Sequence, residues 1–174
     1  EWFVKFGASG AYTPFAREVL GDDLLVPLDD GHDGQGYWLQ ARDPALRDGA
    51  REARIFDRPA YRAQRMLYPT LAAPFRLGGE QTLLWGLVIV NVLVIAGGTY
   101  LASRLAVAAG ATPLAGLAFT LNPLVLISLM MDFGDALALA TLVGVVLFLR
   151  EHRYRVALGF AAAAVLAKAF TLLP

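Results

Sequence analysis

A run of 23 residues without a charged side chain, from Gln81 to Ser103, limits the possible folds of this protein more than any other stretch. At 1.5 Å per residue a helix of this length extends roughly 34 Å, enough to cross the hydrocarbon core of a bilayer. The charges divide accordingly, because residues 1–80 hold 12 of the 15 acidic and 10 of the 15 basic side chains. We therefore expect the first part to face water and the rest to face lipid.

Apolar stretches continue to the end of the sequence and predict an all-α membrane protein. The predicted transmembrane helices cover about residues 81–108, 113–131, 133–149 and 156–174. Thr112 and Pro113 form a start signal for the second helix, and Asn122-Pro123 in its middle predicts a kink, since proline removes a backbone hydrogen bond. The expected architecture is a polytopic transmembrane helix bundle, with residues 1–80 forming a partly helical extracytoplasmic loop domain.

The basic residues predict which ends of the spans face the cytoplasm. Arg150, Arg153 and Arg155 lie in the turn before the fourth span, whereas the turn from Asp132 to Asp135 carries only acids. Lys and Arg concentrate on the cytoplasmic side of membrane proteins. We therefore expect residues 1–80 and the acidic turn on the outer face. The sequence starts without methionine and ends within an apolar run, so we interpret it as a fragment truncated at both ends.

Charge and cysteine content exclude several classes of function. The net charge is zero, and the basic residues of the first part are interleaved with acids rather than run together, so a basic surface for nucleic acid is not expected. The sequence contains no cysteine, which excludes disulfide frameworks, thiolate zinc sites and cysteine nucleophiles.

Two segments of the outer part predict helices, at about residues 43–55 and 57–67, each with an acidic N-cap and an early proline. In the second, Arg58, Arg62 and Arg65 follow i, i+4, i+7 spacing and share one face. Such a helix can lie in the headgroup layer and offer guanidinium groups to phosphates. The alternative is a solvated helix whose arginines pair with neighbouring acids.

The densest polar cluster lies on a predicted glycine-rich turn and precedes two aromatic residues. Its members are Asp29, Asp30, His32 and Asp33, followed by Tyr37 and Trp38. Carboxylates and a histidine this close can provide a base, a set of metal ligands or, with the aromatic rings, a sugar-binding edge. Asp-Gly pairs are also ordinary turn formers, so a structural turn is the simplest interpretation of each.

Three ionisable residues accompany the lipid-facing part. Asp132 as an N-cap and Asp135 in the first turn of the third span have a structural explanation, but the two carboxylates can also orient groups or hold a divalent cation. Lys168 lies about 18 Å along the fourth helix, too deep for an interface residue. Because ionisable groups inside membranes mark functional sites, we interpret Lys168 as functional, with its side chain directed toward the level of the two acids.

Several motifs resemble those of a known family. They are Asp33-Gly34-Gln35, Asp43-Pro44, Tyr61-Arg62, Arg65, Tyr68-Pro69, Leu121-Asn122-Pro123, Asp132-Phe133-Gly134-Asp135 and Lys168. In this order they resemble the first periplasmic loop and the following spans of bacterial polytopic glycosyltransferases of the GT-C superfamily. The resemblance implies a polyprenyl-phosphate sugar as donor. It also implies that an aspartate of the outer loop, here Asp33, is the catalytic base.

The candidate roles follow from this resemblance and from the needs of sugar transfer. Asp33 is the general base of an inverting transfer. The candidates for contact with the substrate and its phosphate are Arg62, Arg65, Lys168, Gln35, Tyr37, Trp38 and Asp135. The candidates for a metal site, binding Mg or Mn, are Asp132 and Asp135. The implied partners are the lipid-linked donor, a glycan, lipid or protein acceptor, and membrane lipids, and the implied location is the bacterial inner membrane.

Two other classes of function fit the same residues. In a transporter or flippase half, Lys168, Asp135 and the kinked Asn122-Pro123 helix would line a substrate path. In a non-catalytic assembly subunit, the outer loop would bind a partner.

Overall fold

The computed structural model describes residues 4–10, 12–21, 31–44 and 64–168, most of which are helical. The first part holds α1 (Thr13–Leu20), α2 (Asp33–Arg42), α5 (Leu67–Ala72) and the 3₁₀ helix η1 (Ala73–Gly78). The second part holds α6 (Glu80–Ala108), the 3₁₀ helix η2 (Pro113–Gly116), α7 (Leu117–Thr120), α8 (Pro123–Met131), α9 (Asp135–Arg150) and α10 (Tyr154–Ala167). Within these ranges no strand forms, which confirms the predicted all-α class.

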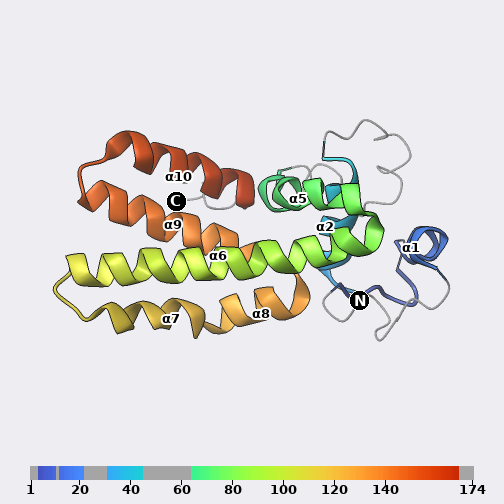
Figure 1. The fold of residues 1–174 in the computed structure, drawn as a ribbon, viewed down its shortest axis with the longest axis horizontal. Helices are drawn as coiled ribbons and strands as arrows, with labels where there is room; N and C mark the ends of the chain where they lie inside the picture. Colours follow the sequence, from blue (N-terminus) through green and yellow to red (C-terminus); the bar gives the residue numbers. More distant parts are fainter. Residues whose placement is uncertain (1–3, 11, 22–30, 45–63, 169–174) are drawn as a thin grey trace.

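The long helix α6 is the axis of the molecule. Its 29 residues extend roughly 43 Å, with α9 and α10 on one side and α7 and α8 on the other (Figure 1). Among the described residues α6 is the one continuous helix long and apolar enough to cross a membrane. A second such span exists if residues 113–131 count as one broken span. The structure therefore does not establish the predicted bundle of four spans.

The second apolar stretch is broken where its proline predicts. α7 ends at Thr120, α8 begins at Pro123, and the two arms of the stretch differ in direction by 49°. The side chain of Asn122 caps the new helix by accepting a hydrogen bond from the Leu124 amide at 2.9 Å. Thr112 caps η2 in the same way, at 3.1 Å from the Leu114 amide, so the start predicted at Thr112-Pro113 and the kink predicted at Asn122-Pro123 are both confirmed.

The last two helices are shorter than the sequence predicts. α9 has 16 residues and packs along α6, and α10, with 14 residues, packs on α9. α10 ends at Ala167, and Lys168 follows it in an extended conformation. The expectation that Lys168 lies inside a span from 156 to 174 therefore differs from the structure, in which Lys168 stands at the C-terminal end of α10. Residues 169–174 lie outside the described ranges.

The helices of the first part pack around the N-terminal half of α6. The core that they share contains Phe6, Trp38, Tyr68, Leu83 and Leu87, all fully buried. The glycine-rich segment predicted as a turn is instead α2. This segment is helical because packing outweighs the low helix propensity of its glycines, and every residue from Gly34 to Ala41 is buried.

The two helices predicted in the outer part fall mostly on residues 45–63, which lie outside the described ranges. Arg58 and Arg62 are among those residues. Residues 64–66 are described and are not helical, since α5 begins only at Leu67. Arg65 is therefore not part of an arginine-bearing helical face.

Candidate functional site

A close approach brings the start of α2 onto the turn between α8 and α9. A Cβ atom added at Gly34 would lie 2.7 Å from the carbonyl oxygen of Met131 and 3.4 Å from the Cβ of Asp132. Only glycine allows this separation without a shift of the backbone. Asp33, the first residue of α2, therefore lies beside the acidic turn, and the two predicted carboxylate segments meet beside the N-terminal half of α6, in a region that we call the carboxylate end (residues 33–37, 65–68, 132–135 and 168).

Asp33 is an accessible carboxylate beside a buried cation. Its side chain is 43% exposed, whereas that of Arg65 is 7% exposed, and the Arg65 Nη1 atom lies 3.8 Å from Asp33 Oδ2. The expectation that Arg65 faces lipid headgroups is therefore wrong, because its guanidinium is enclosed by protein. The pair nevertheless places a fixed positive charge next to the carboxylate predicted to act as base.

Tyr37 connects this pair to the rest of the site through its hydroxyl rather than through its ring face. Its ring is buried edge-on against the ring of Tyr68, with centroids 5.2 Å apart. Burial raises the pKa of Tyr37, as do the charges of Asp135 and Asp33, while the charge and hydrogen bond of Arg65 lower it. The net effect is upward, so the hydroxyl stays protonated at neutral pH.

Asp132 lies at the centre of a buried polar cluster with Tyr68 and Asn91. Its Oδ1 atom accepts hydrogen bonds from the Tyr68 hydroxyl at 2.9 Å and from Asn91 Nδ2 at 3.1 Å. Asn91 Nδ2 also lies 3.2 Å from the carbonyl oxygen of Ser128, so the cluster joins α5, α6 and α8. Burial raises the pKa of Asp132 to about 6, with both hydrogen bonds acting in the opposite direction.

The backbone of Asp132 corrects one prediction. Asp132 terminates α8 in the left-handed conformation (φ 54°, ψ 47°), whereas Gly134 occupies the N-cap position of α9. Asp132 is thus a C-cap rather than the predicted N-cap. Aspartate is one of the few residues that tolerate this conformation, because its short polar side chain bonds locally.

Asp135 and Lys168 form an ion pair between α9 and the end of α10. The Lys168 Nζ atom donates to Asp135 Oδ1, and both side chains are 16% exposed. Lys168 therefore reaches the acidic turn, the direction in which the sequence places it.

The proposed metal pair does not form a metal site. The Oδ1 atom of Asp132 is bonded to Tyr68 and Asn91, while Asp135 pairs with Lys168. In the part of the chain that the structure describes, no group of three or more acidic, histidine or cysteine side chains is placed to hold an ion. These residues do not fit a divalent cation, and no step is assigned to one.

Two further predicted substrate contacts are part of the core. Trp38 is fully buried and packs edge-on against Phe6 with ring centroids 5.3 Å apart, and the guanidinium carbon of Arg42 lies 5.4 Å from the Trp38 ring centroid. Gln35 is also buried. Neither Trp38 nor the ring of Tyr37 offers a face to a sugar, so the predicted stacking platform is wrong. Arg62, Asp29 and Asp30 lie outside the described residues.

Sequence reasoning missed Tyr68 and Asn91 as members of the site. Asn91 had a visible signal, because it is an amide within the charge-free stretch and a buried amide needs hydrogen-bond partners. Tyr68 lies 64 residues from Asp132, and no local pattern links them.

No family model matches this sequence, and no match was found among curated proteins or solved structures. The fold and the site define a helical protein with a long apolar axis and a cluster of paired carboxylates and cations at one end.

Proposed function

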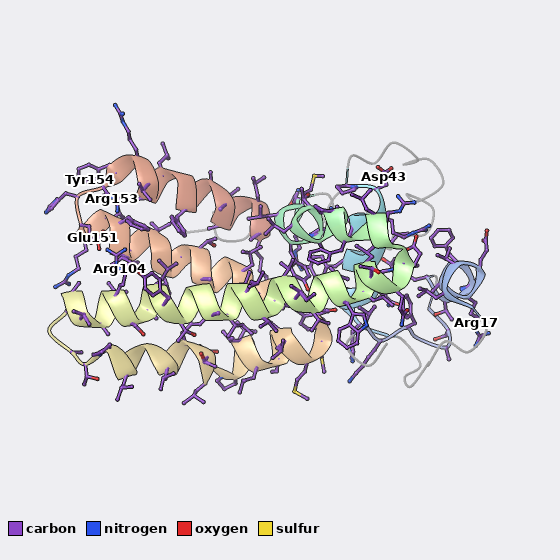
Figure 2. The ribbon with its side chains drawn as sticks, in the orientation of Figure 1. Arg17, Asp43, Arg104, Glu151, Arg153 and Tyr154 are labelled. Carbon is purple, nitrogen blue, oxygen red and sulfur yellow. The ribbon has the colours of Figure 1, made fainter. Side chains whose placement is uncertain are left out.

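We propose that this chain is part of a polytopic bacterial inner-membrane glycosyltransferase of the GT-C type. It moves a sugar from a polyprenyl-phosphate donor to a glycan, lipid or protein acceptor on the extracytoplasmic face. The observation that carries the proposal is the placement of the accessible Asp33 beside buried Arg65, at the same end as the Lys168–Asp135 pair. The arginine turn lies at the opposite end of α6, as a membrane topology with residues 1–80 outside requires (Figure 2).

The chemistry uses an accessible base and nearby cations. Asp33 accepts the proton of the acceptor hydroxyl while the acceptor oxygen forms a bond to the anomeric carbon. The bond from that carbon to the phosphate oxygen breaks, and the lipid phosphate leaves from the opposite face with inversion. Arg65 and Lys168 supply positive charge close to the negative charge that develops on this leaving group.

Membrane placement is supported by apolar side chains that the protein leaves uncovered. They lie along α6 and along the broken stretch beside it and include Trp85, Leu93, Tyr100, Leu114, Leu121 and Met130. Soluble proteins rarely leave large apolar surfaces exposed. A bilayer would cover these side chains, with α6 as the central span.

The test is the change Asp33→Asn in the full-length protein, supplied with a polyprenyl-phosphate sugar. The substitution keeps the shape and removes the basicity, so the turnover number should fall by about 10²–10⁴-fold while donor binding persists. Asp43→Asn, at the other end of α2, is the matched control and should retain the parental turnover. Parental turnover in both variants would leave the carboxylate end without a catalytic role.

The broken stretch favours one rival function. Discontinuous helices line the substrate sites of many transporters, and the 49° break at residues 121–122 fits that pattern. Movement of a lipid-linked sugar across a vesicle membrane, unaffected by Asp33→Asn, would identify a flippase half. If neither sugar transfer nor movement of the lipid is detected, a non-catalytic assembly subunit remains as the function.

A further inference from the structure

A hollow lies at the end of the molecule opposite the carboxylate end. It has a volume of about 500 Å³, within the usual range for ligand sites. One face of α6 supplies Tyr100, Ser103, Arg104 and Val107, at i, i+3, i+4 and i+7 spacing, and the other lining residues are Ala108, Pro113 and Glu151. Its walls are mostly apolar carbon, and its charges come from Arg104 and Glu151.

The charges around this hollow are held in place and are positive in sum. Glu151 accepts a hydrogen bond from Arg104, and its Oε2 atom lies 4.0 Å from Arg153 Nη1. Arg150 donates to the carbonyl oxygen of Ala108 at 2.6 Å. Two arginines thus pair with one carboxylate and a third lies at the C-terminal end of α6, which leaves an excess of positive charge in this region. Figure 2 shows Arg104, Glu151 and Arg153 gathered at this end, which we call the arginine end (residues 100–108, 113 and 150–155).

Exposed aromatic and apolar side chains flank the same hollow. Tyr100 and Tyr154 are both exposed, and so are Val107 and Leu114. A tyrosine presents an apolar ring and a polar hydroxyl, and such residues gather where hydrocarbon meets headgroups. The arginine end therefore combines an apolar wall with cations and amphipathic rings at one level.

We infer that this hollow binds the phosphate of one anionic phospholipid, of the phosphatidylglycerol class. Arg104, which lines the hollow, donates charge-assisted N–H···O bonds to the phosphate oxygens, Arg153 adds positive charge from beside Glu151, and an acyl chain covers Val107 and Pro113. A free phosphate ion would not cover the apolar wall of the hollow. A phospholipid covers this wall with an acyl chain and also pairs its phosphate with the cations. The inference rests on the membrane placement in the proposed function and is independent of sugar transfer.

The experiment measures lipid binding to the full chain, purified in neutral detergent, by native mass spectrometry. Phosphatidylglycerol and phosphatidylcholine with identical acyl chains are the probes. We expect the parental protein to retain the first at least tenfold better. Arg104→Gln should abolish this preference, whereas Arg155→Gln, which removes the same charge from a residue outside the lining, should keep it within about twofold.

A second variant separates a binding defect from a folding defect. Val107→Trp fills the apolar wall without changing charge, on an exposed position where the fold tolerates a larger side chain, and it should also abolish retention. Equal retention of the two lipids would overturn the inference. Equal losses of lipid retention in Arg104→Gln and Arg155→Gln would also overturn the inference, since they indicate diffuse electrostatic attraction. Displacement of the lipid by millimolar inorganic phosphate would overturn it as well. Parental turnover in Asp33→Asn with lipid retention intact would refute only the sugar-transfer proposal.

Discussion

The two charged regions beside α6, one around Asn91 and the other at its C-terminal end, hold their charges in contrasting ways. At the carboxylate end, Arg65 and Asp132 are buried, and the Lys168–Asp135 pair is nearly so. At the arginine end, the arginines are exposed or half-buried, and two of them pair with a single carboxylate, Glu151. Buried charges keep a fixed geometry, which positioned chemistry needs, whereas charges that reach the surface can be shared with the phosphates of a headgroup layer.

The largest expected difference between the ends concerns pH. The pKa of Asp132 is about 6 in the folded state against 3.8 for the ordinary group. An acid with a raised pKa binds more protons when folded than when unfolded between these two values. The free energy of unfolding should therefore fall by up to about 3 kcal/mol as pH rises from about 4 to about 6, and then level off.

Denaturant titrations in detergent at pH 4.5 and pH 7 check this prediction. Asp132→Asn should reduce the slope, because an amide does not titrate. The same two titrations on Glu151→Gln show how much of the pH dependence of the unfolding free energy comes from the carboxylate at the arginine end. An unchanged slope in Asp132→Asn would show that another group causes the dependence.

A similar contrast is expected from two glycine substitutions. The added Cβ of Gly34→Ala would meet the Met131 carbonyl oxygen at 2.7 Å and push α2 away from the acidic turn. A displacement of about 1 Å in a catalytic group reduces rates by about 10²-fold, so sugar transfer should fall by that order. Gly159→Ala, in α10, meets nothing within 4 Å and should leave transfer unchanged. Equal transfer rates in the two variants would mean that the contact with Met131 does not position Asp33.

Double-mutant cycles on the two interhelical ion pairs should give the smallest difference. The Lys168–Asp135 pair, with both side chains 16% exposed, should show a coupling free energy of about 1–3 kcal/mol in unfolding measurements. The Arg104–Glu151 pair, with side chains 37% and 25% exposed, should show about 0.2–1 kcal/mol. The cycles use Lys168→Gln with Asp135→Asn, and Arg104→Gln with Glu151→Gln. A larger coupling at the arginine end would reverse the comparison.

The parts of this fold that local chemistry controls were predictable. The charge-free run predicted α6, Thr112-Pro113 a helix start and Asn122-Pro123 a kink, because caps and proline act within a few residues. α2 was predicted as a turn because its glycines disfavour an isolated helix. Its helical form depends on burial against Met131, which lies nearly a hundred residues away.

The candidate site was predictable only in its outline. Charge patterning brought the carboxylates of Asp33 and Asp135 to one end, but it did not show which side chains are buried. Trp38 and Asp132 were interpreted from their immediate neighbours, as a ligand platform and an N-cap. The structure places them in the core and in a polar cluster because of contacts made by distant helices.

The length of α6 has a consequence for the membrane around it. Its charge-free stretch of roughly 34 Å exceeds an average hydrocarbon core of about 30 Å. A helix in this situation tilts or draws a thicker layer of lipid around itself, at a modest energetic cost per ångström of mismatch. In the proposed bilayer, α6 joins the two sites rigidly, since Asn91 contacts the carboxylate end and Arg104 belongs to the arginine end, roughly 20 Å further along the helix. Lipids with longer acyl chains would therefore move both ends together relative to their headgroup layers, so that bilayer thickness acts on the two sites at once.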